Sequence, residues 1–233
     1  MALRVFILGL FIVTLFSTKG WAQFQLGGQI GLNLSTLTLN ENLHWKDQRT
    51  IKAGFNTGFH LSVGTENFGY QPGFMYSQQG VRYADRNVGF GNDGVFVERL
   101  NYFRLPQMFY GKISVTDFLQ IRIGGGPYLG FLLAASTKRK DSDGDVAITD
   151  KDIGFLPDDG NDYLPFDFGF KLGTGVEFQL GPGEIVFSPT YSFGMVAVDH
   201  PENISNAADD FNELRKNSVI GISTMYLFTP SEL

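Results

Sequence analysis

His60 and Ser62 stand two residues apart, a spacing that places both side chains on one face of a β-strand. An imidazole beside a hydroxyl is the base and nucleophile of many hydrolases, and a nearby acid would complete such a site. A lipid-modifying hydrolase is therefore one hypothesis for this chain. The alternative, which we favour, is that His60 belongs to a polar hydrogen-bond network, because the pair shares its strand face with polar and small residues.

Three aspartates, Asp141, Asp143 and Asp145, alternate in the acidic stretch DSDGDVAITDKD and resemble the start of a calcium loop. The EF-hand loop requires Gly at its sixth position and Glu at its twelfth, where this chain has Val146 and Asp152. A weak calcium site is one reading of the stretch. The default expectation is a solvated, mobile acidic loop over residues 136–163, with no metal. No cofactor is predicted.

A third set of charged residues alternates with large apolar side chains along the predicted strands. Its members are Arg104, Arg122, Asp167, Lys171 and Glu177. Each member therefore lies on the face of its strand opposite the apolar one. The pattern is clearest in FDFGFKLGTGVEFQLG, residues 166–181, where apolar residues recur at every second position and small, polar or charged residues stand between them. We predict that these side chains form a polar network in a narrow lumen. There, Asp167, Glu177 or an acid of a neighbouring strand would compensate the charge of Lys171.

Long runs with this two-residue period recur along the chain and predict strands rather than helices. Eight segments carry the period: residues 24–37, 51–64, 68–83, 98–113, 118–133, 166–181, 184–195 and 218–228. Short connections (TEN, SVTD and GPG) follow the second, fourth and sixth segments, and long polar connections follow the others. This alternation is typical of a barrel inserted from one side of a membrane. We therefore predict an all-β fold: an eight-stranded antiparallel up-and-down transmembrane β-barrel.

A soluble, lipocalin-like barrel is the alternative with the same strand number, and its apolar side chains would surround an internal ligand. The polar face is rich in glycine, which weakens exposed strands but suits a narrow, side-chain-filled interior. Aromatic residues near strand ends, among them Phe68, Tyr83 and Phe228, fit the interfacial girdles of membrane barrels. We therefore expect the apolar face to contact outer-membrane lipid.

The N-terminal segment has the features of a cleaved signal peptide: Arg4, an apolar run of about a dozen residues, and a small-residue end at Gly20-Trp21-Ala22. We expect residues 1–22 to be removed and residues 23–233 to form the barrel domain, exported to the outer membrane. Removal leaves 16 Lys and Arg against 24 Asp and Glu, a net charge of −8. An acidic chain without a basic cluster argues against a nucleic-acid partner.

Several stretches taken together resemble the PorT-like outer-membrane β-barrel proteins of the Bacteroidota. They are GGQIGLNLSTL, YQPGFMYSQQG, NYFRLPQMFYGK, GGGPYLGFLLAA and FDFGFKLGTGVEF. Arg104 stands where that family often has an acid. The resemblance covers essentially the whole chain after residue 22, and it brings no catalytic motif.

The PorT-like family is named for a protein needed for protease secretion through the type IX system. The resemblance therefore implies a non-enzymatic membrane scaffold, or a component of an envelope or secretion assembly. We expect a protein partner to contact its external acidic loops or its periplasmic turns. The leading alternative is a small-solute channel, which would require a continuous aqueous path through the lumen.

Overall fold

The structure is a computed structural model that describes residues 23–38, 49–84, 94–141, 146–154, 162–199 and 215–230. Residues 1–22 lie outside these ranges, so signal-peptide cleavage stays a prediction. The described strands are β1 (Gln23–Thr38), β2 (Arg49–Thr50), β3 (Lys52–Gly64), β4 (Phe68–Ala84), β5 (Gly94–Thr116), β6 (Leu119–Asp141), β7 (Val146–Lys151), β8 (Phe166–Leu180), β9 (Gly183–Gly194) and β10 (Lys216–Phe228). Within those ranges, no helix is long and apolar enough to cross a membrane.

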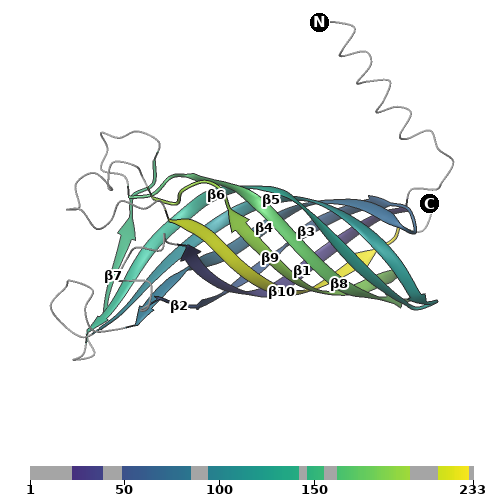
Figure 1. The fold of residues 1–233 in the computed structure, drawn as a ribbon, viewed down its shortest axis with the longest axis horizontal. Helices are drawn as coiled ribbons and strands as arrows, with labels where there is room; N and C mark the ends of the chain where they lie inside the picture. Colours follow the sequence, from purple (N-terminus) through teal and green to yellow (C-terminus); the bar gives the residue numbers. More distant parts are fainter. Residues whose placement is uncertain are drawn as a thin grey trace, which may run out of the picture.

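Eight of the described strands form a closed barrel, shown lengthwise in Figure 1. Taken in chain order without β2 and β7, each strand pairs antiparallel with the next, and β10 pairs with β1. The closure is seen at Leu26, which lies opposite Leu61 of β3 and Phe228 of β10. The predicted eight-stranded antiparallel up-and-down barrel is confirmed.

Three short turns join the barrel strands at one end, which we call the turn end. They cover residues 65–67, 117–118 and 181–182. The second is shorter than the predicted SVTD, because β5 continues to Thr116. In the third, Gly181 has a φ of 59°, in the left-handed region that tight hairpin turns require and that glycine adopts without steric cost.

The opposite end, which we call the loop end, extends beyond the predicted strands. β5 and β6 each have 23 residues, about twice the roughly 9–11 residues that cross a bilayer. The six-residue strand β7 pairs with residues 135–140 of β6, so the expected loop over 136–163 is wrong in part. The two-residue strand β2 similarly pairs with the end of β4. Figure 1 shows β7 standing out from this end of the barrel.

An apolar core fills the interior at the loop end. It gathers buried side chains of β1, β4, β5 and β6 with two residues from outside the strands. Its members are Leu37, Val81, Tyr83, Leu100, Tyr102, Leu132, Ala135, Tyr163 and Val198. Tyr83 therefore points inward and is no girdle residue, contrary to the prediction. Tyr163 and Val198 close this mouth from the connections that lead into β8 and out of β9.

Candidate functional site

The barrel interior is the candidate site, because the charged residues singled out from the sequence all lie on its lumen side. Arg104, Arg122, Asp167 and Glu177 are buried, and each of the two acids is only 2% exposed. Lys171 is half-buried. The structure distributes these residues over two layers of ion pairs, with Lys171 on β8 at a position between them.

The loop-side layer is built around Asp167, where β8 begins. Arg104 of β5 forms a salt bridge with this carboxylate, 2.9 Å from Nη2 to Oδ2. Tyr128 and Asn217 donate to the same oxygen, each over 3.0 Å. Arg104 also donates to Gln79 over 2.9 Å. One carboxylate oxygen thus joins side chains of β5, β6 and β10 across the lumen.

The turn-side layer is built around Glu177, near the end of β8. Arg122 of β6 pairs with Oε1 over 3.0 Å, and Lys112 of β5 pairs with Oε2 over 2.9 Å. Lys112 also approaches Glu184 of β9, 3.5 Å away. Arg122 donates to Gln71 of β4 as well. This layer therefore also spans the lumen.

Both layers share one construction, in which a glycine faces a tyrosine and the tyrosine supports an arginine. Tyr128 lies opposite Gly169, and the Arg104 guanidinium sits 4.1 Å from the Tyr128 ring centroid. Tyr110 lies opposite Gly69, and Arg122 sits 4.2 Å from its ring centroid. A Cβ on Gly169 would come within 2.7 Å of the Tyr128 hydroxyl, and one on Gly69 would come within 2.3 Å of the Tyr110 ring. These glycines therefore leave free the space that the tyrosine rings occupy.

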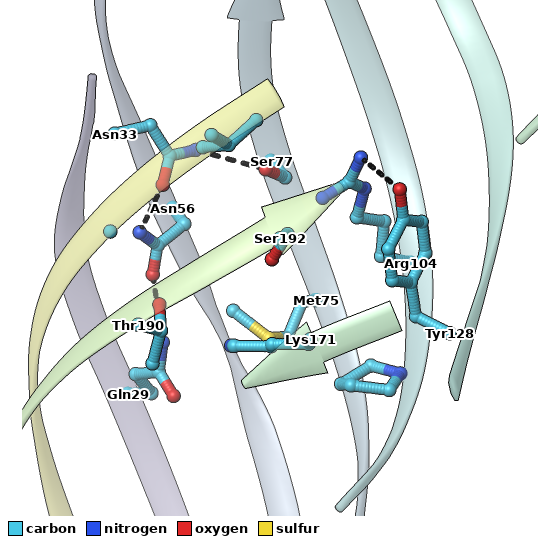
Figure 2. Close-up of a pocket in the computed structure, with 13 residues that line it drawn as sticks. Gln29, Asn33, Asn56, Met75, Ser77, Arg104, Tyr128, Lys171, Thr190 and Ser192 are labelled. Carbon is cyan, nitrogen blue, oxygen red and sulfur yellow. Dashed lines mark hydrogen bonds between the residues drawn. The ribbon is translucent and has the colours of Figure 1, made fainter. Parts of the chain in front are cut away.

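A chain of amides runs along the lumen side of the neighbouring strands β1, β3 and β4, beside the two layers (Figure 2). Gln29 donates to Asn56 over 2.8 Å, Asn56 donates to Asn33 over 2.7 Å, and Asn33 donates to Ser77 over 2.9 Å. All four side chains are buried. The chain satisfies polar groups that would otherwise be costly to bury.

Lys171 does not receive the counter-charge that the sequence suggested. Among the residues described by the structure, no carboxylate lies within salt-bridge distance of its ammonium group. Asp167 and Glu177 share its strand face but lie four and six residues away, which corresponds to about 13 and 20 Å along a strand. Both acids are instead paired with cations from neighbouring strands. The expected compensation of Lys171 is therefore wrong.

His60 and Ser62 do not form a base and nucleophile pair. Both are buried in the lumen, but the Ser62 hydroxyl lies 2.5 Å from the Tyr110 hydroxyl instead. Neither nitrogen of His60 has a hydrogen-bond partner among the described residues. The expectation of a lumen position is met, whereas the expectation of a hydrogen-bond network at His60 is wrong. This geometry gives no activated nucleophile.

Sequence reasoning missed several charged residues of the interior, although a signal for some was present. Glu98 and Lys112 lie on the same face of β5 as Arg104, since all three have even numbers in one strand. Arg215 and Asp199 lie outside the strands, and strand periodicity could not have found them.

A third charged cluster lies at the loop end, beyond the two layers. Arg215 donates to Glu98 of β5 over 2.7 Å and forms a two-point contact with Asp199. Burial disfavours the charge of Arg215, but the carboxylates of Glu98 and Asp199 outweigh it and raise its pKa. The cluster ties both ends of the connection between β9 and β10 to the wall of the barrel.

The suggested calcium ligands lie largely beyond what the structure describes. Asp143 and Asp145 are outside the described residues, and of Asp141 only its backbone position at the end of β6 is known. Elsewhere in the described ranges, no group of three or more His, Asp or Glu residues could hold a metal ion. A calcium site at these aspartates stays a prediction.

The outer surface of the barrel is apolar around its circumference. Phe59 is 74% exposed and Ile30 is 69% exposed, and every barrel strand contributes large apolar side chains to this exterior belt. Gln107, a polar residue on the outward face of β5, accepts a hydrogen bond from the Tyr70 hydroxyl. Soluble monomers rarely expose apolar surface on this scale, whereas a bilayer requires it.

A closed barrel with a charged interior and an apolar exterior is a transmembrane β-barrel. The family comparison gives the same class, because residues 18–198 match the family model described as the outer membrane protein beta-barrel domain. The chain belongs to this family and is an outer-membrane β-barrel protein.

Solved structures of bacterial outer-membrane barrels also match the chain. The attachment invasion locus protein Ail of Yersinia pestis, in complex with the heparin analogue sucrose octasulfate, is 12% identical. That match covers 88% of this chain and 99% of Ail, with a TM-score of 0.40. Neisserial surface protein A is 8% identical over 87% of this chain and 95% of its own, with a TM-score of 0.39. The comparison with curated proteins finds no match.

Proposed function

We propose that this outer-membrane barrel is a non-enzymatic scaffold that serves as a component of an envelope or secretion assembly. Its exterior belt contacts outer-membrane lipid, and its loop end contacts a protein partner. The resemblance to PorT-like proteins noted in the sequence supports the secretion role.

The filled lumen is the observation that carries this proposal. The layers around Asp167 and Glu177 each join several strands across the interior. The cavity between them measures about 30 Å³, which is room for only one or two water molecules. A barrel closed in this way favours a structural role over the passage of a solute. The absence of a His60–Ser62 contact likewise disfavours the hydrolase hypothesis.

The projecting strand β7 is the surface that we assign to the partner. Among the described strands it pairs only with β6, so its other edge offers unpaired backbone groups. Val146 is 50% exposed and Ile148 is 68% exposed, although both stand clear of the lipid-facing part of the barrel. A free edge with exposed apolar side chains is a surface to which another protein can add a strand.

Site-specific photo-crosslinking in living cells tests this assignment. A photoreactive residue at Ile148 should give a discrete adduct with one protein, whereas the same residue at Phe170 should react mainly with lipid. Ile148→Lys should reduce co-purification of that protein while leaving barrel insertion unchanged. Absence of a protein adduct at Ile148 would contradict the proposed contact.

Conductance in planar bilayers separates the scaffold from the channel. The scaffold should insert without discrete current steps. Reproducible single-channel steps from the wild-type protein would favour the small-solute channel instead.

A further inference from the structure

The central cavity of the barrel has a charge imbalance that the two ion-pair layers do not remove. Two cationic side chains, Lys171 and Arg104, line this cavity, and none of its described lining residues is acidic. The carboxylate that pairs with Arg104 belongs to Asp167, which lies outside the lining. That salt bridge neutralises Arg104, so the excess positive charge at the cavity is that of Lys171.

Unused hydrogen-bond donors surround the same space. Lys171 has no hydrogen bond or ion pair with any residue that the structure describes. The buried Nε–H of Arg104 also has no partner there, although the Nη2 of that side chain is fully engaged. The hydroxyl groups of Ser192 and Thr190 complete the lining on the β9 side. Figure 2 shows Lys171 extending between Met75 and the side chains of Thr190 and Gln29.

An ammonium group that lines a narrow lumen without a counter-charge is unfavourable, and an anion beside it would relieve this cost. We propose that this cavity binds a small monovalent anion of chloride size, held by Lys171 and Arg104. The chemistry fits an anion because the donors are cationic or hydroxylic and no carboxylate lines the cavity. The volume fits as well, since about 30 Å³ exceeds the roughly 10–15 Å³ that one water molecule requires.

The surrounding layers determine how the ion enters. The Glu177 layer lies toward the turn end, and the apolar core with the Arg215 cluster closes the loop end. The anion is therefore trapped while the barrel closes and exchanges slowly afterwards. This inference concerns the interior alone, so it does not depend on the identity of a partner.

Bromide is the probe that tests this site, because it resembles chloride and can be located by anomalous scattering. The full chain after residue 22 is refolded into detergent in sodium bromide, and free salt is replaced by sodium gluconate, whose anion is too bulky for the cavity. The amount of bromide bound per protein molecule is then measured by inductively coupled plasma mass spectrometry. The wild type should retain close to one bromide, and crystals should show an anomalous peak between Lys171 and Arg104.

Two variants distinguish the site from general anion association. Lys171→Met should lose the bound bromide, with Lys171→Gln as a polar substitute if the methionine variant fails to fold. Lys52→Met is the matched control, because Lys52 is a buried lumen lysine outside this cavity, and it should retain the ion. Equal bromide in the wild type and the Lys171 variants, a peak elsewhere, or no retained bromide would overturn the proposal.

Discussion

Arg104 of β5 and Asp167 of β8 meet over the backbone of Gly130, the residue of β6 that lies in register with both. A Cβ on Gly130 would lie 3.3 Å from the Asp167 Cβ and 3.5 Å from the Arg104 Cγ. The two side chains thus lie close to this glycine, and they form a salt bridge between strands that are not neighbours. Three strands are joined by this arrangement, which makes it a structural support of the closed barrel.

Breaking this pair from one side should destabilise the barrel strongly. Asp167→Ala leaves the Arg104 guanidinium buried without its counter-charge, and such a change costs about 3–5 kcal/mol. The double variant Arg104→Met with Asp167→Leu removes both charges and should lose less stability than Asp167→Ala alone. Urea unfolding in detergent, followed by tryptophan fluorescence or gel mobility, measures the difference. Equal midpoints for wild type and Asp167→Ala would show that the salt bridge contributes nothing.

The two faces of β8 should respond oppositely to neighbouring substitutions. Phe170 lies on the exterior belt, where a charge near the bilayer midplane costs about 2–4 kcal/mol. Phe170→Arg should therefore impair insertion, seen as loss of the heat-modifiable folded band on gels. Lys171→Gln keeps a polar side chain in a polar lumen and should still insert. The reverse result would mean that the faces have been assigned wrongly.

Alkaline pH should weaken the loop end through Tyr163. Burial among apolar side chains, with the Glu98 carboxylate as the next cause, raises the pKa of Tyr163 above its usual value of 10.0. The neutral phenol is therefore favoured in the folded state, and this contribution is complete below pH 10. It is lost as pH rises above 10, because the unfolded state then releases a proton that the folded state retains.

Tyr163→Phe should flatten this pH dependence, since phenylalanine cannot titrate. Unfolding midpoints of both proteins at pH 8 and at about pH 11 give the comparison, because an unfolded tyrosine titrates near 10. If the unfolding midpoint of Tyr163→Phe changes with pH as much as that of the wild type, Tyr163 has the same pKa in the folded and unfolded states, which would contradict the prediction.

Single cysteines should report which end of the barrel faces outward, because the chain contains no cysteine of its own. A membrane-impermeant maleimide added to intact cells should label Ile148→Cys on β7, if the loop end is external. Glu66→Cys, in the exposed turn between β3 and β4, should be labelled only after the outer membrane is permeabilised. Labelling of Glu66→Cys alone on intact cells would mean that the barrel has the inverted orientation.

The sequence predicted the barrel well because lipid on one side and a narrow lumen on the other impose a two-residue period. The prediction ended early in β6, where Leu133 and Ala134 are both exposed and the pairing with β5 shifts at Asn101 and Tyr102. Beyond this irregularity the buried residues of β6 have odd instead of even numbers, so the alternation could not be followed further along the sequence. β7 was missed because both of its faces are exposed, and no buried face imposes a pattern on its sequence.

Side-chain partners in the lumen were harder to predict than side-chain directions. Strand parity identified Arg104 and Asp167 as inward residues, but their pairing depends on the register of β5, β6 and β8. Periodicity contains no information on register. For the same reason, the counter-charge of Lys171 was predicted to come from Asp167, Glu177 or an acid of a neighbouring strand. Strand geometry places the first two beyond its reach, and the register brings no acid of a neighbouring strand to it among the described residues.

The most direct test of the central claim is the behaviour of the purified wild-type protein when detergent is removed. The claim is that the belt containing Phe59 and Ile30 faces lipid and that the charged residues face the lumen. Analytical ultracentrifugation should show a folded monomer in detergent micelles or lipid nanodiscs and aggregation after detergent removal. A monomeric, folded protein in detergent-free buffer would contradict the transmembrane assignment, because no soluble monomer could leave that apolar belt in water.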